Sequence, residues 1–273
     1  MNTALDMIPH QAPLRATAHG ISIRDVEMVY RRGQQVTHAL TSCNLDIPAG
    51  SWVSLIGASG CGKSTLLRIL SDIVQPTGGQ ALLGGLTPAE ARAERRFALV
   101  SQSAVMLPWR KVLANVELGL AVARVPRAER RRRAEEAIEM VGLKGFEKAY
   151  PSELSGGMRQ RAAIARALTL KPAYLFMDEP FGALDELLRD RLNFELLRIL
   201  EETRATLLLV THSISEAIIL SDKVVVMSPR PGRITRQIDI DFGHARSPMI
   251  RDDPRFGQLE AEVRHALGHS MGG

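Results

Sequence analysis

A glycine-rich octapeptide in the first quarter of the chain has the spacing of an anion-binding loop. It reads Gly-Ala-Ser-Gly-Cys-Gly-Lys-Ser from Gly57 to Ser64 and fits the pattern G-x-x-x-x-G-K-[ST]. Glycines let successive backbone N–H groups curl round a phosphate, and a helix that starts directly afterwards adds its positive dipole end. Lys63 would place its charge on the β- and γ-phosphates, and Ser64 could ligate Mg²⁺. The predicted nucleotide-binding residues are Gly57, Ala58, Ser59, Gly60, Cys61, Gly62, Lys63, Ser64 and Thr65, with Cys61 contributing only its backbone N–H.

Two carboxylates follow an apolar segment much later in the chain. Residues 174–177 read Tyr-Leu-Phe-Met, and Asp178 and Glu179 come directly after them. A buried strand that delivers a carboxylate beside the phosphate loop is the Walker B arrangement, in which Asp178 would hold Mg²⁺ directly or through water. Glu179 could then polarise the attacking water as general base. Acidic residues at the end of a strand are common and indicate little by themselves. Together with the glycine-rich loop, these two carboxylates predict hydrolysis of a nucleoside triphosphate.

A second candidate phosphate-binding helix start lies at residues 154–158, which read Leu-Ser-Gly-Gly-Met. Ser155 has the residue type of a helix N-cap, and Gly156 and Gly157 would leave backbone N–H groups exposed at the first turn. An ordinary capped helix is the simpler interpretation of these residues taken alone. The full string at 154–158 favours a second phosphate-binding helix start, in addition to the single glycine-rich loop at 57–64.

Strand-like and helix-like segments alternate along most of the chain, which predicts an α/β fold with a largely parallel central sheet. Segments 174–177 and 207–210 are apolar at every position, as expected for strands covered on both faces. The expected strands are 21–29, 43–47, 52–56, 97–100, 174–177, 207–210 and 224–227, with a further strand near 234–240. The expected helices are 64–74, 127–141, 156–170, 187–203, 213–220 and a short one at 256–267.

The segment from Ser103 to Ser155 has helical patterning only, and we expect it to form a helical subdomain inserted into the α/β core. The arginine run at 130–133 could be a nucleic-acid patch, but glutamates interleave it, which favours a solvated helix face with ion pairs. The expected organisation is a flexible N-terminal extension at 1–20, an ATPase domain at 21–240 with 103–155 inserted, and a C-terminal extension at 241–273.

Composition excludes several classes of protein. The 273 residues are 45% hydrophobic and 24% charged, and only two are cysteines, so the chain is neither largely disordered nor a disulfide scaffold. The sequence contains no run of about 18 apolar residues, the length that a membrane-spanning helix needs. The net charge of +5 is a weak lean toward an anionic partner such as nucleotide, phospholipid headgroup or nucleic acid.

The string at 154–158 resembles the LSGGQ signature of the ABC (ATP-binding cassette) ATPase family, with Met158 where glutamine is usual. Other motifs of that family follow in order over residues 21–267. They are Gln102 as the Q-loop glutamine, residues 182–185 ending at Asp185 as the D-loop, His212 as the switch histidine and Tyr30 as the aromatic that stacks on adenine. A strand-end tyrosine remains the alternative for Tyr30, and a strand-end histidine for His212.

This resemblance implies a P-loop NTPase (RecA-like) core with an antiparallel β subdomain and an inserted α-helical subdomain. It implies ATP and Mg²⁺ as cofactors and a head-to-tail homodimer that encloses two ATP molecules. The implied catalytic residues are Glu179 and His212, the metal site is Ser64, Gln102 and Asp178, and Ser155, Gly156, Gly157 and Asp185 contact the nucleotide of the other chain.

Finer patterns at 107–116, 180–186, 210–217 and 230–234 are similar to the nitrate/sulfonate/taurine-type import ATPases. That family works with an integral membrane permease dimer and an extracytoplasmic substrate-binding protein, at the cytoplasmic face of the inner membrane. Trp109, in the first of these segments, is either a permease-facing residue or part of the helical core.

Three alternatives stand beside that interpretation. The chain could serve an importer of a pyrimidine or another vitamin precursor. A non-transport ABC ATPase acting on nucleic acid or ribosomes is disfavoured, because such proteins usually carry two cassettes, long coiled-coil insertions or zinc knuckles, and we expect no nucleic-acid partner. A P-loop kinase or GTPase leaves residues 154–157 unexplained.

Overall fold

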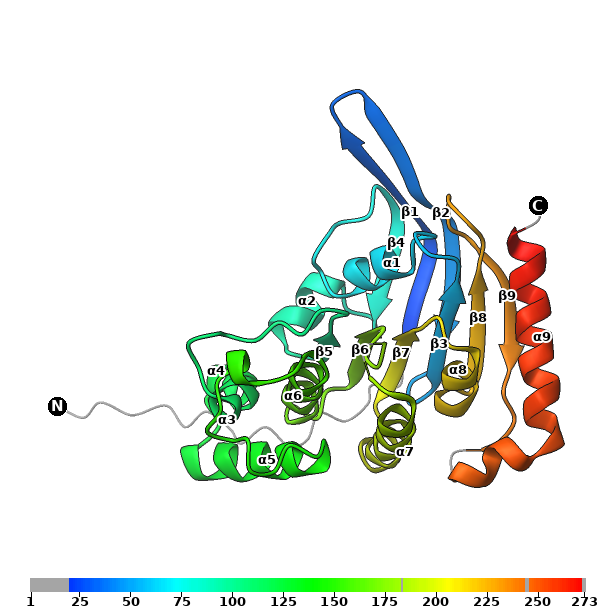
Figure 1. Ribbon diagram of the computed structural model, residues 1–273. Coiled ribbons are helices and arrows are strands. Elements are labelled where there is room, and N and C mark those ends of the chain that lie inside the picture. The colour runs from blue at the N-terminus through cyan, green and yellow to red at the C-terminus, as the bar shows by residue number, and fades with distance from the viewer. Residues whose placement is uncertain (1–19, 183, 244–245, 272–273) are drawn as a thin grey trace.

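The computed structural model describes residues 20–182, 184–243 and 246–271. The expected N-terminal extension therefore lies, apart from Gly20, outside the described residues. The described chain forms a central sheet with helices on its faces, a smaller antiparallel sheet, and a group of helices at one side (Figure 1). This confirms the predicted α/β class.

The central sheet has six strands in the order β5-β6-β7-β3-β8-β9. All neighbours are parallel except β9, which runs antiparallel to β8. Every residue of β6 and β7 is buried, because helices and the second sheet cover both faces. The strands are β3 (Trp52–Gly57), β5 (Phe97–Val100), β6 (Tyr174–Asp178), β7 (Thr206–Val210), β8 (Lys223–Met227) and β9 (Ile234–Asp239). Since β3, β6 and β7 are parallel neighbours, the loops that follow them meet at one edge of the sheet.

Four helices position the predicted site residues, and three of them begin with a side-chain cap. They are α1 (Lys63–Leu70), α6 (Gly156–Leu168), α7 (Glu186–Thr203) and α8 (Ile214–Leu220). The side chains of Ser155, Asp185 and Ser213 cap α6, α7 and α8 by accepting hydrogen bonds from backbone N–H groups in the first turn. Helix α1 ends at Leu70 and not at residue 74 as expected, because the Ser71 hydroxyl donates to the Leu67 carbonyl and Asp72 turns left-handed at φ +54°.

The second sheet has the strand order β2-β1-β4 and is antiparallel. Its strands are β1 (Ile21–Arg32), β2 (Gln35–Ile47) and β4 (Gly78–Leu83), and helix α2 (Pro88–Ala93) follows them. The β1–β2 hairpin projects beyond the body of the molecule (Figure 1). Strand β2 begins at Gln35 and not at Cys43 as expected. Its first four residues are exposed or half-buried, so they show no alternation of apolar and polar side chains from which a strand could be predicted. Strand β4 and helix α2 were not predicted, since Gly78 and Gly79 open β4 without any strand pattern.

Between residues 103 and 155 of the described chain, helices are the only regular secondary structure. They are α3 (Val112–Val116), α4 (Leu118–Val122), α5 (Arg127–Met140) and the 3₁₀ turn Pro151–Glu153. Helices α3 and α5 pack on α6, so this group attaches to the core through the helix that begins with the Leu-Ser-Gly-Gly string. The arginine run of α5 forms ion pairs with Glu129, Glu135 and Glu136 along the exposed face.

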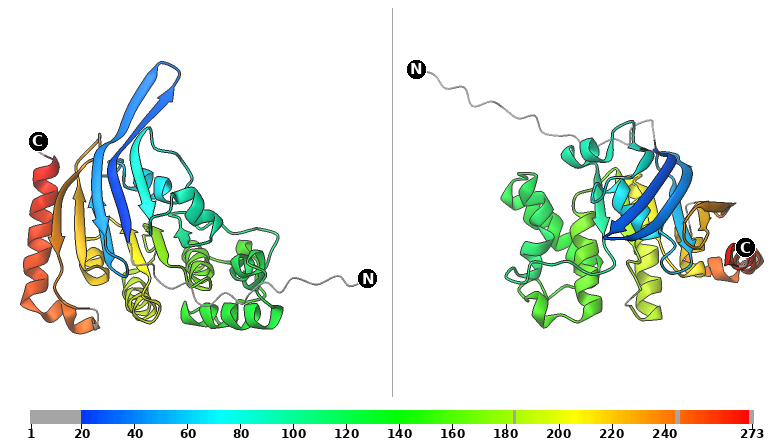
Figure 2. Two further views of the ribbon diagram at one scale, coloured as in Figure 1. Left: turned by 180° about the vertical axis from the view of Figure 1, so that it is seen from behind. Right: turned by 90° about the horizontal axis from the view of Figure 1, so that it is seen from above.

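The C-terminal helix α9 (Pro254–Met271) is longer than the expected 256–267 and follows the 3₁₀ turn Pro248–Asp252. It packs against β8, β9 and α8 and thereby covers the outer edge of the central sheet (Figure 2). Phe256, Val263 and Ala266 are buried apolar residues of this helix. Within the described part of the chain, no helix combines the length and apolar character needed to cross a membrane.

Candidate active site

A cavity of about 530 Å³ lies where the glycine-rich loop faces the part of the β1–β2 hairpin from Tyr30 to Ala39, which includes its turn. Nine predicted residues line it: Tyr30, Ser59, Gly60, Gly62, Lys63, Ser64, Thr65, Gln102 and Glu179. Segments from five parts of the chain thus meet round a single space, and most of the predicted nucleotide-binding residues lie in its wall.

The loop from Gly57 to Gly62 has the open backbone that a phosphate cradle needs. Gly60 and Gly62 have φ values of +72° and +116°, which a side chain would strain. A Cβ atom at Gly62 would also lie 2.6 Å from a Leu40 methyl carbon. These residues fit a bound triphosphate, because the loop can present its N–H groups without obstruction by side chains.

The Lys63 ammonium is already directed at the cradle. Its Nζ donates to the carbonyl of Gly57 at 2.8 Å and to that of Ala58 at 3.0 Å. The side chain is 6% exposed. The predicted residues Gly57, Ala58 and Cys61 do not line the cavity but hold this lysine from behind. The Lys63 ammonium is therefore held at the floor of the loop, almost entirely shielded from solvent.

Ser64 and Asp178 come together although 114 residues separate them in the sequence. The Ser64 hydroxyl donates to Asp178 Oδ1 at 2.9 Å, at the end of β6. Burial raises the pKa of Asp178, and the hydrogen bond from Ser64 opposes that rise. Among the described residues no three His, Cys, Asp or Glu side chains gather round a metal position. A hydroxyl beside one carboxylate fits Mg²⁺ held mainly by phosphate oxygens and water.

Glu179 lies at the centre of a second group of polar side chains. Gln102 Nε2 donates to Glu179 Oε2 at 2.9 Å, and His212 Nδ1 lies 3.6 Å from the same oxygen. Glu179 adopts a left-handed φ of +47°, which costs about 1–3 kcal/mol for a non-glycine residue. Its backbone N–H donates to the Val210 carbonyl at 2.8 Å, which holds this turn in place. The structure thus brings both predicted catalytic residues and the predicted Q-loop glutamine together.

A buried carboxylic acid, Glu216, supports the segment that carries His212. Glu216 is 5% exposed and accepts a hydrogen bond from the Thr211 hydroxyl. The Ser213 N–H in turn donates to the Thr211 hydroxyl oxygen at 3.1 Å. Burial raises the pKa of Glu216 from its ordinary value of 4.5 to about 7, and the Thr211 hydroxyl opposes that rise. Glu216 lies in the 210–217 pattern, but the sequence predicted no role for it, because its burial cannot be told from the neighbouring residues.

This shift predicts a pH-dependent gain in stability for Glu216→Gln. A folded-state pKa above the unfolded value means that ionisation disfavours the fold, so the stability that the neutral acid contributes is lost as pH rises from 4.5 through 7. The amide cannot ionise and still accepts from Thr211. We expect Glu216→Gln to raise the free energy of unfolding, by roughly 2 kcal/mol more at pH 8 than at pH 5.5. Urea titration at both pH values measures this.

Glu201→Gln is the matched control for that experiment, because it removes the same charge from an exposed position. It should leave the free energy of unfolding nearly unchanged at both pH values. A gain for Glu216→Gln that is equal at pH 5.5 and pH 8 would show that Glu216 does not titrate in this range.

The remaining predicted residues lie outside the cavity lining. Ser155, Gly156 and Gly157 form the N-terminus of α6, where Ser155 Oγ accepts from the Met158 N–H at 3.2 Å. Asp185 caps α7, and its Oδ1 accepts from the Leu188 N–H at 2.9 Å. The four residues therefore mark two helix starts that do not reach this chain's own cavity.

Several lining residues were missed by sequence reasoning. Arg230 Nε and Nη2 donate to the Gly60 carbonyl at 3.2 and 3.1 Å, from a loop 170 residues away. Arg32, Gln35, Thr37 and Ala39 of the hairpin complete the wall beside Tyr30. The hairpin positions carry no motif, and Arg230, although it begins the 230–234 pattern, had no predicted role in the site. Only the fold brings these residues to the glycine-rich loop.

Comparison with known proteins agrees with this geometry. The family model described as ABC transporter matches residues 40–182. The chain is 46% identical to the taurine import ATP-binding protein TauB of Rhizobium johnstonii over 88% of its length and 92% of that protein. The corresponding protein of Burkholderia pseudomallei is 39% identical over 89% of this chain and 95% of its own length.

A solved structure of the ATP-binding cassette MJ0796, dimeric and bound to ADP and Pi, superposes with a TM-score of 0.75 at 32% identity. The match covers 81% of this chain and 98% of that one. It confirms the P-loop NTPase fold with its antiparallel sheet and helical part, and it supports ATP as the nucleotide. The glycine-rich loop, the paired carboxylates and these relatives lead to one conclusion: the chain belongs to the ABC transporter ATPase family and is an ATPase.

Proposed function

We propose that this chain is the ATP-hydrolysing subunit of an ABC importer and energises uptake of a small sulfonate of the taurine type through a separate membrane permease. The observation that carries the proposal is the cavity formed by the glycine-rich loop, Gln102 and Glu179 in a chain that is similar, over nearly all of its length, to two taurine import ATP-binding proteins. Within the chain we propose residues 21–240 as the ATPase domain, with 103–155 as an inserted helical subdomain.

The geometry of the site supports a different role for each of its side chains in binding and hydrolysing ATP. Lys63 and the loop N–H groups would hold the β- and γ-phosphates, and Tyr30, which is 37% exposed at the cavity rim, would stack on adenine. Ser64 and Asp178, with Gln102 nearby, would hold Mg²⁺, which neutralises developing phosphate charge when bound. Glu179 would take the proton of the attacking water, and His212 would contact the γ-phosphate from the other side of Glu179.

The two helix starts outside the cavity are the basis for proposing a homodimer. Ser155, Gly156 and Gly157 expose the N-terminal N–H groups of α6, a favourable place for an anion. A second copy placed head to tail would bring these groups and Asp185 to the phosphates held by the first copy. The dimeric state of the solved MJ0796 cassette supports this arrangement.

The proposed permease contact lies in the segment between β5 and α3. Trp109 is 71% exposed and Val105 is 62% exposed, so Trp109 is not a core residue of the helical group. Residues 103–109 carry no charge, and large exposed apolar side chains mark protein-binding surfaces. Such a contact would hold the subunit at the cytoplasmic face of the inner membrane, where the permease would receive solute from an extracytoplasmic binding protein.

Partner recovery tests this proposal. A tagged chain expressed in its own cells and extracted in mild detergent should bring down a hydrophobic permease, and cells lacking the chain should lose taurine uptake. Retention of taurine uptake together with loss of nitrate or vitamin-precursor uptake would reassign the solute. Recovery of rRNA or DNA in place of a membrane protein would contradict the importer.

Trp109→Ala sharpens the same experiment. We expect the variant to recover at least about threefold less permease and to lower uptake in cells, because truncating a central interface tryptophan typically costs more than 1 kcal/mol. ATPase activity of the isolated subunit should stay largely intact, since Trp109 lies outside the ATP cavity. Met249→Ala removes an equally exposed apolar side chain elsewhere and serves as control. A joint loss of activity and thermal stability in Trp109→Ala would contradict the docking role.

A further inference from the structure

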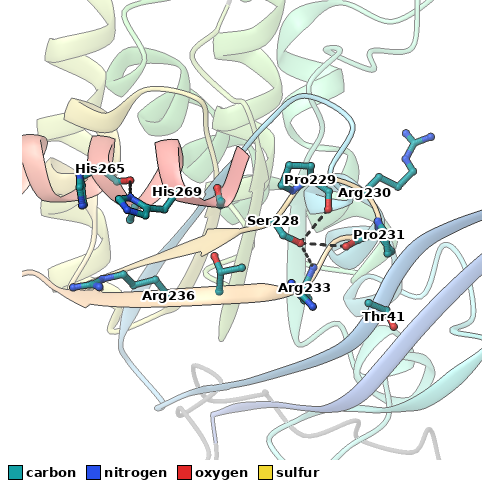
Figure 3. A pocket seen from close by; sticks show the side chains of 12 residues that line it. Thr41, Ser228, Pro229, Arg230, Pro231, Arg233, Arg236, His265 and His269 are labelled. Atoms are coloured by element: carbon teal, nitrogen blue, oxygen red, sulfur yellow. Dashed lines mark hydrogen bonds between the residues drawn. The ribbon is translucent and has the colours of Figure 1, made fainter. Parts of the chain in front are cut away.

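Cavities outside the ATP site differ in how their polar side chains are arranged. One of about 570 Å³ lies between the β8–β9 loop and α9, and Figure 3 shows two of its arginines, Arg230 and Arg236, pointing in different directions. Another, of about 410 Å³, lies among the first half of α7, the start of α8 and the segment that leads into α9. The lining of this α7–α8 cavity consists of Glu186, Arg189, Asp190, Asn193, Ser213, Ser215, Glu216, Arg251, Phe256 and Glu260.

Three polar atoms in the wall of the α7–α8 cavity are buried and have no hydrogen-bond partner among the described residues. They are Arg189 Nε, Asn193 Oδ1 and Glu216 Oε1. Arg189 and Asn193 lie one turn apart on α7, and Glu216 lies on α8, which packs against α7. Polar atoms buried without partners cost free energy, so three of them in one wall indicate a role other than packing.

Arg189 is bonded to the segment that follows β6. Its Nη2 donates to the Leu184 carbonyl at 2.9 Å. The Leu184 N–H donates to the Phe181 carbonyl at 3.1 Å, and the Gly182 N–H donates to the Glu179 carbonyl at 3.3 Å. These hydrogen bonds link Arg189 on α7 to the turn in which Glu179 has its left-handed φ.

Glu216 is bonded in a similar way to the segment that follows β7. Its Oε2 accepts from the hydroxyl of Thr211, the residue before His212. The two segments touch, because a Cβ at Gly182 would lie 3.8 Å from His212 Cε1. Burial raises the pKa of Glu216, and the Thr211 hydroxyl and the positive charge of Arg189 oppose that rise. Arg189 and Glu216 therefore interact across the cavity, and each holds one of the two segments beside the catalytic carboxylate.

The other acidic groups of the wall are paired or lie nearer to solvent. Asp190 accepts from Arg251 in two hydrogen bonds of 2.6 Å. Glu186 is exposed and Glu260 is half-buried. Glu216, which is 5% exposed, is thus the acid that faces Arg189 in the buried part of the cavity.

We propose that Arg189 and Glu216 are positioning residues for ATP hydrolysis and together fix the segments after β6 and β7 relative to each other. The inference rests on the proposed roles of Glu179 and His212. Neither Arg189 nor Glu216 lines the ATP cavity, so the pair acts through the groups that it holds. Misplacing a catalytic group by about 1 Å can lower a rate by about 10²-fold. Loss of the pair should therefore lower kcat for ATP and leave KM nearly unchanged.

Steady-state ATP hydrolysis at pH 8, above the pKa of about 7 for Glu216, tests the pair. Arg189→Gln should lower kcat at least about tenfold and change KM less than about threefold. Arg189→Lys keeps the charge and a donor, and its kcat should return to within about threefold of wild type. Arg198→Gln removes an exposed arginine from the same helix, outside the cavity, and should hydrolyse ATP as wild type does.

Three results would overturn the role of Arg189. They are an unchanged kcat in Arg189→Gln, a fall in kcat that Arg189→Lys does not recover, and a rise in KM as large as the fall in kcat. Thermal unfolding of each variant shows whether it is folded under the assay conditions.

A double-mutant cycle tests whether the two residues act together. Glu216→Gln keeps the acceptor for Thr211 and loses the charge that faces Arg189, so kcat should fall at least about threefold although the protein should become more stable. The double variant should turn over no more slowly than Arg189→Gln, because the pair is already broken. Falls in kcat that multiply in the double variant would overturn the pairing.

Glu179→Gln, assayed in parallel, separates this inference from the proposed function. Normal turnover in Glu179→Gln would contradict the proposed general base. Loss of turnover in Glu179→Gln together with a normal kcat in Arg189→Gln would contradict the positioning pair alone.

Discussion

Glu179→Gln should lower ATP turnover by about 10²–10⁴-fold, the range typical for loss of a general base. The amide keeps the length of the side chain and can still accept from Gln102, which lies 2.9 Å from Glu179 Oε2. Lys63, Ser64 and the loop N–H groups are unchanged, so ATP binding should survive. Single-turnover hydrolysis and equilibrium binding, measured on the same preparation, separate the two effects.

The same variant tests the proposed dimer. Replacing the anion relieves repulsion against the γ-phosphate, so Glu179→Gln should accumulate as an ATP-bound dimer on size exclusion while wild type stays mostly monomeric. Adding Ser155→Arg should return it to monomer, because a bulky side chain would occupy the position of a phosphate held by the partner. Normal turnover in Glu179→Gln would contradict the base assignment. Loss of turnover without any dimer in ATP would contradict the head-to-tail site.

Lys63→Ala should reduce kcat/KM for ATP by at least about 30-fold, because truncating a buried charge with paired polar partners typically costs 2–5 kcal/mol. The loss has two physical sources. The phosphates lose the ammonium at the floor of the loop, and the carbonyls of Gly57 and Ala58, which now accept from Nζ, lose that donor. Nucleotide binding and steady-state hydrolysis should therefore both fall.

Lys148→Ala is the control, since it removes an exposed lysine of the helical group. It should hydrolyse ATP as wild type does. Thermal unfolding of Lys63→Ala in the absence of nucleotide shows whether the fold is retained. Near-normal turnover in a folded Lys63→Ala protein would refute the phosphate-loop assignment.

The helix starts and the buried strands could be predicted from local residues. Ser155, Asp185 and Ser213 were readable as caps or motif residues because a cap acts on backbone groups two or three positions away. Strands β6 and β7 were readable because burial on both faces demands an apolar side chain at every position. Strand β4 was not predicted, since it begins with Gly78 and Gly79, which carry no side chains that could form an alternating pattern.

The amino-acid sequence by itself determined the phosphate loop, the core strands and the family, because each is encoded by residues that act within a few positions of one another. Only the tertiary structure decided which distant groups meet. Ser64 reaches Asp178, Gln102 reaches Glu179 and Arg230 reaches Gly60 across 114, 77 and 170 residues. The exposure of Trp109 and the raised pKa of Glu216 were decided in the same way. The physical reason is that burial and long-range contact depend on the order in which strands assemble in the sheet, β5-β6-β7-β3-β8-β9, which no local pattern of side chains specifies.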